Sequence, residues 1–212
     1  MKKLITILLS LTVLSVTSAQ ASQTSYKDIT TAINSLKIAD EVRTGYKRTL
    51  FKHWTSAGNG CDSRKAVIIS EAIKKPVVEK GCLIKGGEWL SIYDNVKVTE
   101  ASKLDVDHFV PLAEAWDSGA SAWDAAKKEK YANDQTDPRH LIAVTGASNR
   151  SKSDQDPAEW MPTNKAYTCE YLVNWVSVKV RWNLSVDKKE KEFILANSKS
   201  CKSTKITVTL EK

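Results

Sequence analysis

Two short apolar segments, each carrying a histidine, most constrain how this chain can fold. Residues 104–112 read LDVDHFVPL, and residues 139–145 read RHLIAVT. Both have the length and apolar content of strands, and Pro111 ends the hydrogen-bonding ladder of the first one. Gly146 then predicts a turn, and Ser148 can cap a helix that begins at Asn149. We therefore predict a strand, a second strand and a helix that meet at one place.

The polar residues of this segment suit a metal-dependent hydrolase. The carboxylate of Asp107 is a hard ligand for a divalent cation, and the imidazole of His108 titrates near neutrality and can act as a general base. Asn149 offers a neutral carbonyl oxygen that suits Mg²⁺ or Mn²⁺. Arg150 and Lys152 can contact a phosphate. Neighbouring strand residues point to opposite faces, so His108 needs a bulge or a turn to join Asp107.

In this order and spacing, these residues resemble the HNH, or ββα-metal, nuclease family, and most closely its exported bacterial endonucleases. The resemblance rests on DVDHFVPL at 105–112, on the nine-residue step from His140 to Asn149, on SNRSKSD at 148–154 and on DPAEW at 156–160. Further similar segments are GYKR at 45–48, FKHW at 51–54, CDSR at 61–64 and YTC at 167–169. The resemblance thus covers most of the chain beyond its first residues.

The resemblance implies a role for each of these side chains. Asp107 and Asn149 would bind one Mg²⁺ or Mn²⁺ ion, and His108 would take a proton from the attacking water. The ion would polarise a phosphate oxygen and stabilise the leaving 3′ oxygen, which gives a 5′-phosphate and a 3′-hydroxyl. His140 stands where the family usually has an asparagine that braces the loop and orients the base. We count His140 with the catalytic residues, while bracing, proton transfer and metal binding all stay open for it.

The first 21 residues have the features of an export signal. Two lysines precede an apolar run from Leu4 to Val16, and Ala19-Gln20-Ala21 is a small-x-small cleavage site. We expect a bacterial-type signal peptide at 1–21, with an uncleaved N-terminal anchor as the alternative. One secreted or periplasmic domain at 22–212, outside the membrane, would remain. Loss of the two lysines takes the formal charge from +7 to +5, which permits a polyanionic partner without requiring one.

Four cysteines remain beyond the export signal, namely Cys61, Cys82, Cys169 and Cys201. An even number in an exported chain indicates two disulfides. Of the three pairings, Cys61–Cys82 with Cys169–Cys201 closes the shortest loops, and we prefer it. A zinc site is the competing interpretation, but the sequence has no C-x-x-C or H-x-x-x-H spacing.

The period of the apolar residues predicts the other elements. The expected helices are Tyr26–Trp54 (as two helices or one kinked helix), Arg64–Lys75, Ala166–Trp182, and one opened by an Asp187–Glu190 capping box and ending near Ser198. A hairpin with its turn at Gly86-Gly87 is expected over Val77–Tyr93, a half-exposed strand over Thr204–Leu210, and a frayed terminus over Ser22–Ser25.

We therefore expect an α+β domain in which a ββα-metal motif is embedded among helices and stapled by two disulfides. The expected function is metal-dependent hydrolysis of phosphodiester bonds in nucleic acid, with DNA as the expected partner and no protein partner. Two alternatives stay open. One is a non-catalytic nucleic-acid-binding module on the same scaffold, and the other is an exported phosphodiesterase of a substrate other than nucleic acid. Base preference cannot be read from the sequence, because phosphate contacts carry no base information.

Overall fold

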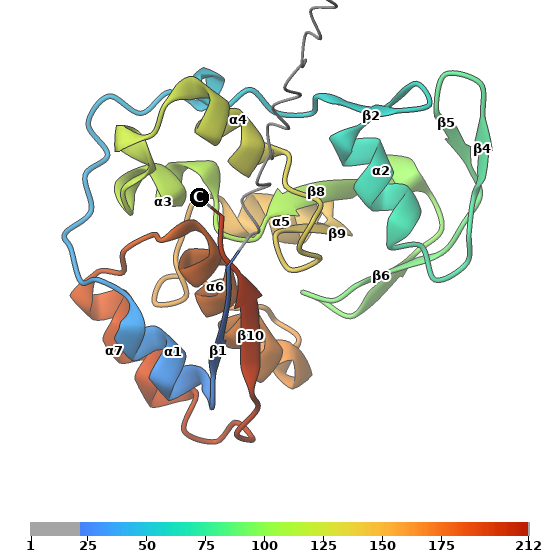
Figure 1. Ribbon diagram of the computed structural model, residues 1–212. Helices are drawn as coiled ribbons and strands as arrows, with labels where there is room; N and C mark the ends of the chain where they lie inside the picture. Colours follow the sequence, from blue (N-terminus) through green and yellow to red (C-terminus); the bar gives the residue numbers. More distant parts are fainter. Residues whose placement is uncertain (1–21, 212) are drawn as a thin grey trace, which may run out of the picture.

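The computed structural model describes residues 22–211, so the signal peptide expected at 1–21 lies outside the described residues. This range folds into short strands, most of them in the first half of the chain, and into helices, most of them in the second half (Figure 1). In chain order the elements are β1 (Gln23–Tyr26), α1 (Ile29–Ser35), β2 (Ser56–Gly58), β3 (Cys61–Asp62), α2 (Ser63–Ser70), β4 (Val77–Glu79), β5 (Leu83–Lys85), β6 (Trp89–Ser91), β7 (Val96–Val98), β8 (Leu104–His108), α3 (Leu112–Asp117), α4 (Ala125–Ala132), β9 (Leu141–Thr145), α5 (Gly146–Lys152), α6 (Thr168–Trp182), α7 (Lys188–Asn197) and β10 (Ile206–Thr209). The fold is a mixed α and β structure.

Helix α6 lies at the centre of the larger of two cores. The residues expected on its apolar face are all buried: Tyr171, Leu172, Trp175, Val178 and Trp182. The predicted helix and its buried face are confirmed, although the helix begins at Thr168 instead of Ala166. Helix α1 and strand β10 pack against it, and Figure 1 shows α7 beside α1 on the same side of the molecule. Each large apolar side chain buried here stabilises the fold by about 1.5–3 kcal/mol.

Strands β8 and β9 pair antiparallel, and α5 follows β9 directly. Asp107 is opposite Ile142 in this pair, and His108 is opposite Leu141. The predicted order of strand, strand and helix is therefore present. The helix begins earlier than expected, at Gly146, because Thr145 caps it by accepting a hydrogen bond from the backbone N–H of Ser148. A second core under this pair includes Val67 of α2, Trp89 of β6, and Leu104, Val106 and Leu141.

Both preferred disulfides are confirmed. Cys61–Cys82 joins β3 to the turn between β4 and β5, and Cys169–Cys201 joins the start of α6 to the segment after α7. All four cysteines are thereby used, and none is left to hold zinc. Each bridge stabilises the fold by roughly 2–4 kcal/mol, mainly because it restricts the unfolded chain.

The prediction of two helices, or one kinked helix, over Tyr26–Trp54 is wrong. Only α1 is helical over several turns, and the chain from Lys37 onward is mostly irregular. The apolar residues that suggested a second helix do not share a buried face, since Val42 is 56% and Leu50 41% exposed. Gly45, with φ +80°, also departs from helical geometry. Long-range hydrogen bonds from this segment replace those of a helix, for example from the N–H of Ala39 to the carbonyl of Val186.

The predicted hairpin over Val77–Tyr93 is also corrected. Strand β4 pairs with β5 across a turn at Lys80-Gly81-Cys82, while β6 pairs with the later strand β7. Gly86 and Gly87 join β5 to β6 instead of forming a hairpin turn. The disulfide at Cys82 and the positive φ of Gly81, +75°, fix the turn earlier in the chain.

Three further predictions can be compared with the structure. Strand β10 and helix α7 are confirmed, and Asp187 caps the helix by accepting from the N–H of Glu190. The other half of the expected capping box is absent, because the carboxylate of Glu190 accepts from Trp175 and Lys179 instead. Residues Ser22–Ser25 are not frayed, since β1 pairs with β10 in register from Gln23 to Tyr26. Helix α2 ends at Ser70, well before Lys75.

Candidate active site

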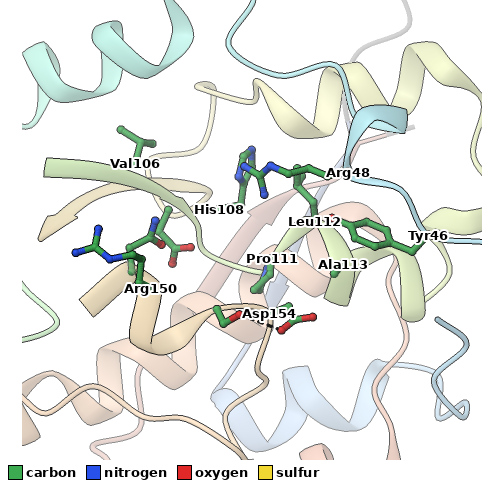
Figure 2. Close-up of a pocket in the computed structure, with 12 residues that line it drawn as sticks. Tyr46, Arg48, Val106, His108, Pro111, Leu112, Ala113, Arg150 and Asp154 are labelled. Carbon is green, nitrogen blue, oxygen red and sulfur yellow. Dashed lines mark hydrogen bonds between the residues drawn. The ribbon is translucent and has the colours of Figure 1, made fainter. Parts of the chain in front are cut away.

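A cavity of about 490 Å³ lies against the end of β8 and the exposed side of α5. Asp107, His108 and Asn149 all line it, together with Arg150 and with Arg48 from the irregular N-terminal segment. Figure 2 shows the labelled side chains of His108, Arg48 and Arg150 around this space. The structure thus brings the amide of Asn149 into the same cavity as the carboxylate and the imidazole of the adjacent residues Asp107 and His108.

The imidazole of His108 is held through one of its two ring nitrogens. Its Nε2 lies 2.9 Å from the backbone oxygen of Ala132. A carbonyl can only accept, so Nε2 carries the hydrogen and Nδ1 keeps its lone pair. The ring of Trp54 stacks on the imidazole, with centroids 5.1 Å apart. Burial lowers the pKa of His108 well below 6.5, and the hydrogen bond to Ala132 only partly offsets this. The ring is therefore neutral near pH 7.

Asp107 is bound on one of its two oxygens. Oδ2 accepts from Nζ of Lys152 at 2.6 Å and from the hydroxyl of Tyr93 at 2.7 Å. The residue is 5% exposed. Burial raises the pKa of Asp107, and the charge of Lys152 and the two hydrogen bonds oppose that rise. No hydrogen bond to Oδ1 is made by the described residues.

The two basic residues expected at a phosphate lie in different environments. The side chain of Arg150 is 74% exposed and its Nη1 lies 3.9 Å from Oδ2 of Asp105. Lys152 is 0% exposed and paired with Asp107, so in this structure it cannot contact a phosphate in the cavity. Lys152 is the last residue of α5. It points inward because it lies on the face of the helix that packs against β8 and α6.

Asn149 is fixed through its nitrogen. Nδ2 donates to Oδ2 of Asp105 at 3.3 Å, and Arg64 and Arg150 lie close to the same carboxylate. Because the amide nitrogen faces Asp105, the carbonyl oxygen of Asn149 is left for another partner. Asp105 therefore orients Asn149 from outside the cavity.

His140 does not line the cavity. It is fully buried, and its Nε2 lies 2.6 Å from the backbone oxygen of Tyr131. The next carbonyl, that of Ala132, is the one that binds His108. The backbone oxygen of His140 also accepts from the N–H of Phe109, which follows His108. His140 thus binds the residue before Ala132 through its side chain and the residue after His108 through its backbone. Its Nδ1 has no partner among the described residues.

Arg48 was not among the residues expected at this site, although it lies in the GYKR segment that is part of the resemblance. The irregular segment that bears it is pinned by Arg43, whose guanidinium binds Asp117 and Asp154 at 2.5 Å each. Trp116 also donates from its indole to the carbonyl of Thr44, at 3.3 Å. These contacts are made across large sequence separations, so no local pattern could have indicated them.

The donor atoms in the cavity fit a small hard cation. Asp107 has one oxygen without a hydrogen bond, Asn149 has a free carbonyl oxygen, and both residues line the same cavity. Carboxylate and carbonyl oxygens are the ligands that Mg²⁺ and Mn²⁺ prefer. Neither cysteine sulfur nor a histidine pair is present among the lining residues, so a softer metal finds no matching donors.

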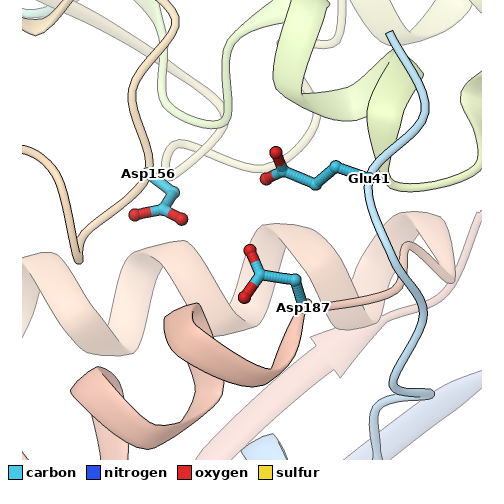
Figure 3. A group of neighbouring side chains, drawn as sticks. All are labelled: Glu41, Asp156 and Asp187. Atoms are coloured by element: carbon cyan, nitrogen blue, oxygen red, sulfur yellow. The ribbon is translucent and has the colours of Figure 1, made fainter.

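A separate group of carboxylates lies outside the cavity. Figure 3 shows Glu41, Asp156 and Asp187 pointing toward one another, and one oxygen of each lies within 4.8 Å of the others. Burial, and then the nearby charge of Glu114, raises the pKa of Glu41 to about 8. These acidic groups are close enough to hold a cation, but they do not line the cavity that contains His108.

We expect Glu41→Gln to stabilise the protein increasingly as the pH rises. A carboxyl whose pKa is higher folded than unfolded costs stability as it ionises, so its cost grows between about pH 4.5 and pH 8. Glutamine does not ionise and has no such cost. The melting temperatures of Glu41→Gln and of the parent protein should therefore agree near pH 4.5 and separate toward pH 8. An exposed control on α7, Glu192→Gln, should show no such trend, and equal curves for Glu41→Gln and the parent protein would contradict the prediction.

Comparison with known proteins places the chain in a family. The model of the family described as GmrSD restriction endonucleases, C-terminal domain, matches residues 73–197, which is more than half of the chain. The chain belongs to this family. The matched region of the GmrSD C-terminal domain includes Asp107, His108, His140 and Asn149, and leaves out Arg48.

The sequence of a relative from outside the bacteria aligns with most of this chain. An "Uncharacterized secreted protein" of the fungus Arthroderma benhamiae is 38% identical over 157 residues, which cover 74% of this chain and 76% of the relative. No solved structure matches. Within residues 22–211, no helix combines the length and the apolar character needed to cross a membrane.

Proposed function

We propose that this protein is an endonuclease that hydrolyses phosphodiester bonds in nucleic acid, with DNA as its substrate and one divalent cation as its cofactor. The observation that carries the proposal is that Asp107, His108 and Asn149 line one cavity. Membership of a family described as restriction endonucleases supports it. We further propose that the protein is secreted or periplasmic, which agrees with the name of the fungal relative.

In this proposal His108 is the general base. Its Nδ1 takes a proton from the water that attacks the phosphorus, while Nε2–H stays on the carbonyl of Ala132. The stacked ring of Trp54 keeps the imidazole in one orientation. We assign His140 a bracing role, because its side chain binds the carbonyl next to the one that orients His108.

Asp107 and Asn149 would hold the cation. When bound, a divalent ion supplies charge that stabilises the phosphate oxygens and the leaving 3′ oxygen. Oδ1 of Asp107 and the carbonyl oxygen of Asn149 are the atoms we assign to it, since their other polar atoms are already hydrogen-bonded. We identify the segment β8–β9–α5 as a ββα-metal motif on this basis.

Arg48 and Arg150 are the phosphate-binding residues of the proposal. Both line the cavity, and both present guanidinium groups that can bind two phosphate oxygens at once. Arg48→Ala should lower the rate of plasmid cleavage by about tenfold or more, because charge-assisted hydrogen bonds to a phosphate contribute roughly 1.5–3 kcal/mol. The measurement is the initial nicking rate, with Lys47→Ala as the neighbouring control. An unchanged rate for Arg48→Ala would remove Arg48 from the site.

A plasmid nicking assay with a metal series tests the proposal. The disulfide-bonded protein should convert supercoiled plasmid to open-circular and linear forms with Mg²⁺ or Mn²⁺ and should stop when EDTA is added. Binding of DNA without nicking under any metal would favour a non-catalytic binding module. Hydrolysis of a simple phosphodiester without nicking of DNA or RNA would favour a phosphodiesterase with another substrate.

A further inference from the structure

One fully buried ammonium group joins the strand and the helix that line the cavity. Nζ of Lys152 lies 2.6 Å from Oδ2 of Asp107 and 3.2 Å from the backbone oxygen of His108. It also lies 6.0 Å from the ring centroid of Trp175. A lysine is rarely buried unless its charge is paired and its donors are used, because removing the charge from water is costly. Lys152 is 0% exposed, so all three of these contacts are made inside the protein.

A buried tyrosine binds the same carboxylate oxygen. The hydroxyl of Tyr93 donates to Oδ2 of Asp107 at 2.7 Å. Its ring is fully buried and packs against Trp160 and Tyr171, with centroids 5.3 and 5.7 Å away. Oδ2 of Asp107 therefore accepts from two donors, and both belong to fully buried side chains, those of Lys152 and Tyr93, whose conformations the surrounding packing restricts.

From this geometry we propose that Lys152 and Tyr93 are positioning residues, which hold Oδ2 of Asp107 so that Oδ1 alone faces the cavity as a ligand oxygen for a divalent cation. The inference rests on the proposed function. Lys152 does more than Tyr93, because the same ammonium fixes the backbone of His108. As the last residue of α5, it also sets the distance between Asp107 and Asn149 of that helix.

Residues that orient a metal ligand in this way change affinity without touching the ion. Loss of such a contact typically weakens metal binding or activity by 10–100-fold. A residue with a purely structural role would lower the melting temperature and leave the metal affinity of the folded protein unchanged. The affinity for Mn²⁺, measured without nucleic acid, therefore separates the two roles.

Tyr93→Phe is the first test variant, since it removes one hydroxyl and no charge. Its control is Tyr167→Phe, which removes a hydroxyl bonded to Asn174 in the same aromatic cluster. Lys152→Arg is the second test variant, because it keeps the charge but replaces the compact ammonium by a larger, planar guanidinium with a fixed donor geometry. Its control is Lys179→Arg, at another fully buried lysine, which pairs with Glu114 and Glu190.

Mn²⁺ binding to each full-length, disulfide-bonded protein can be measured by electron paramagnetic resonance of the free ion, alongside melting curves. Tyr93→Phe and Lys152→Arg should each bind Mn²⁺ about tenfold more weakly, and both controls should bind within about twofold of the parent protein. If Lys152→Arg does not fold, Tyr93→Phe decides the question. Parent-like affinity in a folded Tyr93→Phe protein, with plasmid cleavage by the parent intact, would overturn this inference alone. A parent protein that takes up no Mn²⁺ would overturn it together with the proposed cofactor.

Discussion

Replacing His108 by alanine is expected to reduce plasmid cleavage by about 100-fold or more. The imidazole is the one group in the cavity with a free nitrogen lone pair held at a fixed position, since Nε2 is bound to Ala132 and Trp54 stacks on the ring. Without Nδ1 the attacking water must lose its proton to solvent. The measurement is the initial nicking rate at saturating Mg²⁺ or Mn²⁺, compared with the parent protein.

His53→Ala provides a matched control for this experiment. Its ring lies 6.3 Å from that of His108, but its Nδ1 bonds to the carbonyl of Phe51 and it does not line the cavity. We expect cleavage by His53→Ala to stay within a few-fold of the parent rate. If His108→Ala folds and still cleaves at the parent rate, the base has been assigned to the wrong residue.

The largest stability effect is expected at Lys179. This lysine is fully buried, and its Nζ lies 2.7 Å from oxygens of Glu114 and Glu190 and 3.0 Å from oxygens of Ser118 and Ser185, among which its three N–H donors are shared. Lys179→Met leaves two buried carboxylates without their cation, which destabilises a protein by about 3–5 kcal/mol. For a chain of this size, the melting temperature should fall by roughly 6–20 °C.

A multiple variant tests whether the lost charge pairing is the cause. Lys179→Met combined with Glu114→Gln and Glu190→Gln removes the buried charges together, and well-packed neutral replacements are often no less stable than the ion pair. The melting temperature of the triple variant should therefore rise most of the way from that of Lys179→Met to that of the parent protein. If the triple variant is as unstable as Lys179→Met alone, the loss comes from packing around Trp175, which lies 5.6 Å from Nζ and donates to Glu190.

The features that could be predicted from the sequence are those set by nearby residues. The buried face of α6 follows from apolar residues at helical spacing, and the cap at Asp187 from one side chain three residues from its partner. The disulfide pairing follows from loop length in the same way. The strand–strand–helix segment was also predictable, because its motif residues lie within about 50 positions of one another.

The features that could not be predicted depend on contacts across the chain. In the sequence Lys152 is one more basic residue near Arg150, and only the packing of α5 on β8 and α6 buries it against Asp107. Arg48 reaches the cavity because Arg43 ties an irregular segment to α3 and to Asp154. In the same way, the partner of β6 is β7 and not β5, since pairing is decided by the core below the strands and not by the glycines between them.

The pairing of β1 with β10 has a consequence for the order in which the protein can be built. Of the described elements a ribosome makes β1 first and β10 last, so β1 waits without its partner until β10 has emerged. Ile206 and Val208 of β10, which belong to the larger core, arrive just as late. We expect a nascent chain that stays loosely structured until β10 has been made, the state in which a polypeptide can still be threaded through a translocation channel.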